Sequence, residues 1–159
     1  MNVRERLLER LEKAWREFGE SYAGMPDSEL MKPGVTGRWS VRDIIAHVTT
    51  WEEEALKNLP VLLKGGQTTR YSVAYGGINA FNALATGRKS GLSLREVLFQ
   101  RDEIHRRLVD FIGTVPEECL GSKSRFRHRL RMDTYGHYPK HAAAIRKLRI
   151  TNDELRMTN

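Results

Sequence analysis

Three of the five histidines in this 159-residue chain have a spacing that could bind a metal ion. His137 and His141 are four residues apart, so on one helix both imidazoles would lie on the same face, one turn apart. His47 lies about ninety residues upstream, in an apolar segment of its own. Three neutral imidazoles that converge from two helices, with one coordination position left open, would form a catalytic type of site for a first-row metal ion.

The ion expected at such a site is divalent, with Zn²⁺ or Ni²⁺ favoured by imidazole ligands. It could lower the pKa of a bound water to about 7 and so generate a nucleophile, or it could bind and activate a thiolate. The same three histidines could instead be a structural or vestigial cluster in the core. Asp43, one turn before His47, could accept a hydrogen bond from an imidazole or could cap the start of a helix.

A basic segment is the second feature that could bind a ligand. The net charge of +7 comes entirely from residues 121–159, which hold 10 basic and 3 acidic side chains. Within residues 123–131 the basic side chains alternate with others, which predicts an extended segment with its charges on one edge. We expect Arg127 and Arg129 to orient an anionic substrate, although a solvated connection would show the same pattern. Nucleic acid is the least favoured ligand, because the patch is short and holds few aromatic side chains.

Apolar periodicity predicts four amphipathic helices that would position these residues. Ser40 and Ser93 are each followed three residues later by an acidic residue, which is typical of a helix start. A glycine-rich connection of residues 65–92 separates the second and third helices. These features predict an all-α four-helix bundle with a long crossover connection. The expected helices span residues 3–23, 40–60, 93–112 and 133–149, in a single domain of residues 1–150 with a polar tail at 151–159.

The helical register predicts that the three histidines point into the bundle. His47 shares a face with Trp51, and His137 and His141 share a face with Ile145. Bundle cores are where such folds build metal sites from side chains on facing helices.

Pro139 lies between the two downstream histidines and leaves the start of the last helix open to two interpretations. If the helix begins after Gly136, Pro139 falls in the first turn and costs little. If it begins at Asp133, the helix must kink near Tyr135.

Aromatic residues near the histidines are candidates for a substrate pocket. We expect Trp51 and Tyr138, together with Trp39, to line it, although aromatic side chains at helical spacing also suit a core. His105 is expected at the surface or boundary of its helix and His128 in the basic segment, neither as a ligand.

Composition indicates the cellular compartment in which the protein is expected. The single cysteine, Cys119, excludes an intrachain disulfide and favours the cytoplasm. No apolar run approaches the roughly 20 residues that span a bilayer, so no membrane partner is expected.

Two segments resemble the DinB/YfiT-like superfamily of four-helix bundles: GRWSVRDIIAHVTTWEEEAL at residues 37–56 and DTYGHYPKHAAAIR at residues 133–146. In that superfamily a histidine of the second helix and a pair spaced H-x3-H on the last helix bind a divalent metal. The Trp51-Glu52 pair and the DTYGHYPKH segment are most similar to the ClbS/DfsB branch, in which some members lack the histidines and act without an obvious metal.

The resemblance implies several activities rather than one. Members of the superfamily include hydrolases, isomerases, S-transferases that use mycothiol or bacillithiol, and resistance proteins, and many are homodimers. We therefore expect a metal-dependent hydrolase or thiol S-transferase acting on a small molecule, with a low-molecular-weight thiol as a candidate cofactor and with a homodimeric assembly. The alternative is a metal-independent small-molecule binding or resistance protein of ClbS type.

Overall fold

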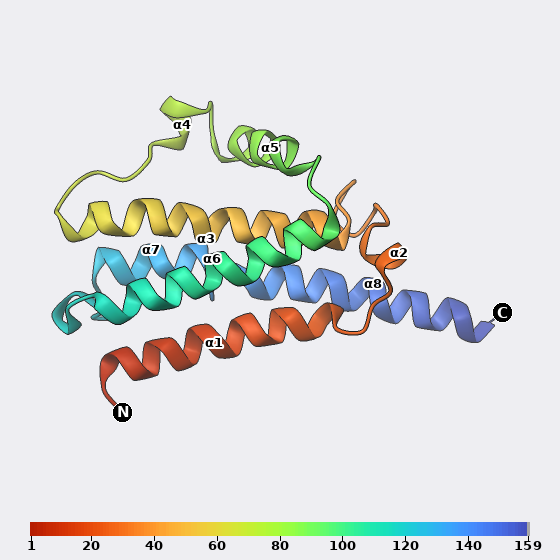
Figure 1. Ribbon diagram of the computed structural model, residues 1–159, viewed down its shortest axis with the longest axis horizontal. Helices are drawn as coiled ribbons and strands as arrows, with labels where there is room; N and C mark the ends of the chain where they lie inside the picture. The colour runs from red at the N-terminus through yellow and green to blue at the C-terminus, as the bar shows by residue number, and fades with distance from the viewer. Residues whose placement is uncertain (159) are drawn as a thin grey trace.

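The computed structural model describes residues 1–158, which fold into an all-helical bundle (Figure 1). The long helices are α1 (Val3–Tyr22), α3 (Val41–Leu63), α6 (Leu94–Thr114) and α8 (Tyr138–Thr158). The shorter ones are α2 (Asp27–Leu30), α4 (Tyr71–Ala74), α5 (Ile78–Lys89), the 3-10 turn η1 (Glu117–Cys119) and α7 (Arg125–Asp133). Within residues 1–158 there is no strand beyond an isolated bridge between Thr36 and Trp39. The predicted all-α class is confirmed.

The helices pack as a bundle of four, in which the fourth position is divided between α7 and α8. Helix α1 packs on α8, whereas α3 packs on α6 and on α7 (Figure 1). Each long helix turns one apolar stripe inward, as the sequence periodicity predicts. The completely buried side chains of this core include Leu7, Leu11, Ile44, Ile45, Leu108, Ile112, Leu130 and Ile145.

The predicted capping boxes are present at the starts of α3 and α6. Ser40 Oγ accepts a hydrogen bond from the Asp43 amide at 3.1 Å, and the Asp43 carboxylate accepts one from the Ser40 amide at 3.0 Å. Ser93 and Glu96 make the same reciprocal pair. Asp43 therefore caps α3, which decides between its two predicted roles.

The basic segment is helical, so the predicted extended conformation is wrong. Ser124 caps α7 by accepting from the Arg127 amide at 3.0 Å. Phe126 and Leu130, four residues apart, are both buried against the core. Burial of this apolar pair outweighs the two-residue alternation of charge, because helical spacing brings Phe126 and Leu130 to the same face of α7.

The last helix begins at Tyr138 rather than at Asp133, so Pro139 lies in its first turn. A tight turn precedes it, in which the Gly136 amide donates to the Arg131 carbonyl at 2.8 Å. A Cβ atom at Gly136 would lie 2.7 Å from that carbonyl oxygen, so only glycine fits. Helix α8 continues to Thr158, so residues 151–158 are helical.

Two other segments differ from or refine the expectation. Helix α3 continues past Pro60 and ends at Leu63. The long connection contains α4 and α5, which lie over the outer side of α3 (Figure 1). Phe81 of α5 is buried against Trp51 of α3, with 5.3 Å between ring centroids. This contact places the connection beside the predicted site.

No helix within residues 1–158 is both long enough and apolar enough to span a bilayer.

Candidate metal centre

The three predicted histidines meet at one point in the bundle. The Nε2 atom of His137 lies 3.1 Å from Nε2 of His47 and 3.0 Å from Nε2 of His141. One possible ligand atom from each residue falls within 4.8 Å of the others. His47 comes from α3, His141 from the first turn of α8, and His137 from the turn just before it.

Aromatic rings hold the imidazoles in place. Trp39 packs on His47 with 4.7 Å between ring centroids, and Trp51 meets His137 edge-on at 6.3 Å. Only 7% of His47 and 6% of His141 is exposed to solvent.

Burial keeps all three imidazoles neutral. Desolvation, followed by the charges of neighbouring groups, lowers the pKa of His47 to about 3 and that of His137 to about 2. Desolvation and Lys140 lower the pKa of His141 to about 4. A neutral imidazole is the form that binds a metal ion, so the cluster has its ligands ready at neutral pH.

The donor atoms fit a divalent first-row ion. Imidazole nitrogens at about 2.0–2.1 Å from a tetrahedral zinc ion would be about 3.4 Å apart, and those on one face of an octahedron about 3.0 Å apart. The Nε2 separations of 3.0 and 3.1 Å match this range. Binding through Nε2 leaves the proton on Nδ1, and Nδ1 of His137 is buried without a hydrogen-bond partner in residues 1–158.

A hollow of about 170 Å³ opens beside the cluster. Trp51 forms one wall and donates from Nε1 to Asn82 Oδ1 of α5 at 2.9 Å. Lys140 is exposed and lies at the rim. Besides His47 and His137, its lining consists of Trp51, Ile78, Asn82, Met132, Asp133 and Lys140.

Asp133 is a functional candidate that the sequence reasoning missed. It lines the hollow, is 3% exposed, and accepts from Arg129 Nε at 2.7 Å. Desolvation raises the pKa of Asp133 to about 6, although Arg129 opposes the shift. It can therefore exchange a proton near neutral pH. The sequence held a signal that could have singled out Asp133, because it is the only acidic residue between positions 121 and 152.

The predicted substrate-binding residues lie in different places. Trp51 lines the hollow, whereas Tyr138 is completely buried and does not line it. Arg127 donates to the Tyr135 hydroxyl at 2.9 Å, outside the hollow. Arg129 reaches Asp133 and also donates to the Tyr71 hydroxyl at 2.7 Å.

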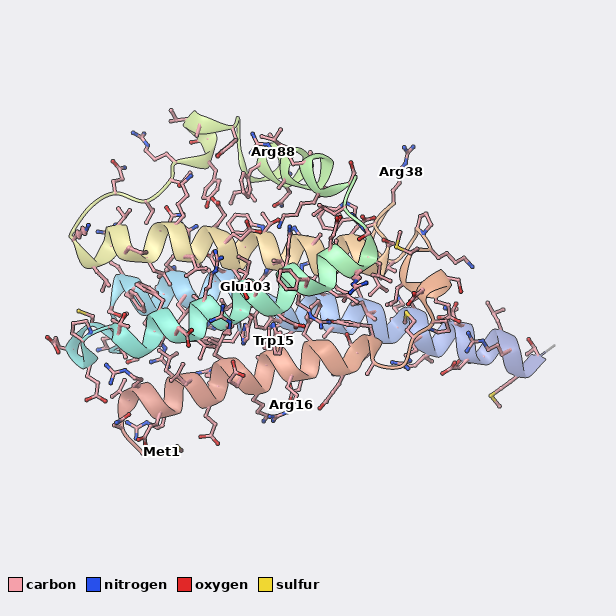
Figure 2. The ribbon with its side chains drawn as sticks, in the orientation of Figure 1. Met1, Trp15, Arg16, Arg38, Arg88 and Glu103 are labelled. Carbon is pink, nitrogen blue, oxygen red and sulfur yellow. The ribbon has the colours of Figure 1, made fainter. Side chains whose placement is uncertain are left out.

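His105 lies in the core, so its expected surface or boundary position is wrong. It is 4% exposed and stacks on Trp15, with 4.0 Å between ring centroids. Trp15 projects from the side of α1 that faces α6 (Figure 2). The two ring nitrogens of His105 contact Glu52 and Glu12, which are distant in sequence. His128 is exposed in the basic segment, as expected.

A second hollow of about 540 Å³ lies beside the start of α7, and we call it the basic groove. Lys123 and Arg125 make no ion pair with any described residue, so their charge is not compensated locally. The groove is lined by Leu62, Thr68, Ser122, Lys123, Ser124, Arg125, His128 and Arg129.

The sequence model of the DinB superfamily matches residues 10–144, which include all three cluster histidines. The chain belongs to the DinB superfamily. No curated protein matches the sequence.

Solved structures share the fold over nearly the whole chain. The sibling lethal factor precursor DfsB superposes with a TM-score of 0.79 at 18% identity, covering 94% of this chain and 96% of DfsB. The colibactin self-resistance protein ClbS, in complex with double-stranded DNA, gives 0.77 at 15% identity, covering 92% and 94%. An uncharacterised protein from Escherichia coli UTI89 gives 0.76 at 17% identity and covers 96% of each chain. Identities this low establish the fold and leave the reaction open.

Proposed function

We propose that this member of the DinB superfamily is a divalent-metal-dependent enzyme that acts on a small molecule, as a hydrolase or a thiol S-transferase. The observation that carries the proposal is the convergence of three neutral Nε2 atoms beside a hollow. His47, His137 and His141 would hold the ion, which when bound supplies Lewis-acid chemistry to the group beside it.

The other residues of the hollow have roles that follow from their chemistry. Asp133 can accept a proton from a reacting group and return it, because its pKa of about 6 is close to neutral pH. Trp51 and Met132 offer apolar surface to the substrate. The volume of about 170 Å³ suits a small molecule or one end of a larger one.

The charge balance favours an anionic group in the substrate or cosubstrate. Three neutral ligands leave the charge of a divalent ion uncompensated, the Asp133 carboxylate is already paired with Arg129, and Lys140 adds a positive charge at the rim. A carboxylate or a thiolate would balance these charges, which is consistent with a low-molecular-weight thiol as cosubstrate.

Elemental analysis tests the metal site. The untagged protein is purified without chelator, reconstituted with Zn²⁺ or Ni²⁺ and desalted. We expect about one ion per chain, and loss of the ion in His141→Ala. His128→Ala, which removes an exposed histidine outside the cluster, is the matched control and should keep the ion. A wild-type protein that stays free of metal after reconstitution would refute the proposal.

The alternative is a metal-independent binding or resistance protein that uses the same hollow. It predicts that small molecules bind equally well with and without chelator. A fragment screen by ligand-observed NMR, repeated in chelator, separates this function from the metal-dependent one.

Binding of double-stranded DNA is a second candidate, favoured by the uncompensated charge of the basic groove and by the DNA in the ClbS complex. Neutralising Lys123 and Arg125 should reduce the slope of log K against log salt by about one for each phosphate that these side chains neutralise. Arg88→Gln, on the exposed face of α5, is the control and should leave the slope unchanged. Homodimer formation remains a prediction that sedimentation velocity can check.

A further inference from the structure

A buried polar network joins all four long helices of the bundle. It takes one residue from each: Glu12 of α1, Glu52 of α3, His105 of α6 and Tyr138 of α8. His105 Nδ1 lies 3.0 Å from Glu52 Oε1, and its Nε2 lies 2.5 Å from Glu12 Oε1. The Tyr138 hydroxyl donates to the same Glu52 oxygen. Glu52, His105 and Tyr138 are 1%, 4% and 0% exposed, so three of the four members are in the core.

The two carboxylates that contact His105 determine its protonation. Burial alone would lower the pKa of His105, but the hydrogen bonds and charges of Glu52 and then Glu12 raise it above its ordinary value. The imidazolium therefore donates one N–H to each carboxylate. The Tyr138 hydroxyl donates to Glu52, because a carboxylate oxygen accepts.

The network reaches the two elements that carry the cluster histidines. Tyr138 directly follows His137 and begins the helix that carries His141. Glu52 lies on α3, five residues after His47. Helix α8 packs mainly on α1, and the Tyr138–Glu52 hydrogen bond joins it to α3 one turn from the contact between His47 and His141.

His137 has an unusual need for such support. A histidine that binds a metal generally donates its other N–H to a carboxylate or carbonyl, which fixes the ring. Nδ1 of His137 has no such partner in residues 1–158. The position of its ring therefore depends on the turn that carries it and on the aromatic rings around it. The His137 and Tyr138 amides both donate to the Thr134 carbonyl, at 2.7 and 2.9 Å, so the turn is continuous with the start of α8.

We propose that Tyr138, Glu52 and His105 are positioning residues that hold the histidine cluster in its metal-binding geometry. Tyr138 fixes the start of α8 against α3, and His105 holds the Glu52 carboxylate oriented to accept from Tyr138. The inference rests on the proposed metal site and adds to it residues that do not contact the metal. It also gives a reason for placing a charged group in the core, since buried polar networks specify one arrangement of helices.

Tyr138→Phe tests the proposal, because it removes only the hydroxyl and keeps the ring. The matched control is Tyr22→Phe, which removes another buried hydroxyl, the one that accepts from Arg101 at 2.8 Å. Co²⁺ affinity and visible absorption report the geometry of the loaded cluster. In the metal-free protein, the ¹⁵N shifts of the imidazoles report the same geometry independently of the metal.

We expect Tyr138→Phe to weaken Co²⁺ binding by about 10- to 100-fold, to change the visible bands, and to shift the imidazole resonances of the cluster. Tyr22→Phe should lose thermal stability and leave all three readouts unchanged. Wild-type affinity, spectrum and imidazole shifts in Tyr138→Phe would overturn the inference and leave the proposed metal site standing. A wild-type protein that binds no Co²⁺ would refute the metal site, and the imidazole shifts would then still decide whether Tyr138 positions the cluster.

Discussion

At the scale of single residues, burial sets the chemistry of the candidate site. His47 and His137 are neutral because the bundle removes water from them, and Asp133 holds its proton more tightly for the same reason. The same effect acts in opposite directions on bases and acids. One hollow thus combines neutral ligands with a carboxyl group that can exchange a proton near pH 6.

The pKa of Asp133 predicts how its removal changes stability with pH. In the unfolded chain the carboxyl group loses its proton near 3.8, whereas in the folded protein it keeps the proton up to about 6. Wild-type stability therefore falls as pH rises from 4 to 6, by up to about 3 kcal/mol from this residue alone. Asp133→Asn removes that loss, so its free energy of unfolding should rise relative to wild type between pH 4 and pH 7. Urea melts in chelator measure the difference, and a difference independent of pH would contradict the assigned pKa.

At the scale of elements, local signals in the sequence were sufficient to predict the four long helices and where two of them begin. Apolar spacing and the Ser40 and Ser93 capping boxes predicted where α3 and α6 begin. They failed at α7, where the alternating charges suggested an extended segment and the buried pair Phe126 and Leu130 determined a helix. The start of α8 could be narrowed only to two positions, because the choice depends on how close Gly136 comes to the carbonyl of Arg131.

The turn between α7 and α8 makes a prediction at this scale. Gly136→Ala places a methyl group 2.7 Å from a backbone carbonyl, which cannot move aside as a flexible side chain can. We expect a loss of about 1–3 kcal/mol in the free energy of unfolding, with weaker metal binding because His137 follows directly. Gly19→Ala is the control, since its new Cβ would meet nothing within 4 Å inside α1. It should stabilise the protein by about 0.5–1 kcal/mol, measured by the same urea melts.

At the scale of the whole molecule, the arrangement depends on contacts between residues far apart in sequence. The spacing of His47, His137 and His141 carried enough information to predict their cluster, although His137 lies in the turn before α8 and not on the helix that the register assumed. The helical register alone places His105 on the buried face of α6 with Leu108 and Ile112. Its partners Glu12 and Glu52 could not be predicted locally, because they come from other helices. An imidazole on a mostly polar helix becomes a core residue only after the bundle has assembled around it.

The dependence of folding on that buried imidazolium gives the last prediction. Glu12 of α1, Glu52 of α3 and Tyr138 of α8 face His105, and the two carboxylates raise its pKa above the unfolded value. A group with a raised folded pKa contributes its full stability below the unfolded pKa of about 6.5 and loses it as pH rises through the folded pKa. His105→Gln should therefore cost about 3 kcal/mol or more at pH 6, since it leaves Glu52 buried without a counter-charge, and clearly less once wild-type His105 loses its proton at higher pH. Denaturation midpoints from pH 5.5 to pH 9.5 measure the difference between the two proteins. A cost that stays constant or grows with pH would mean that His105 is buried in its neutral form, with the shared proton held by a carboxyl group instead.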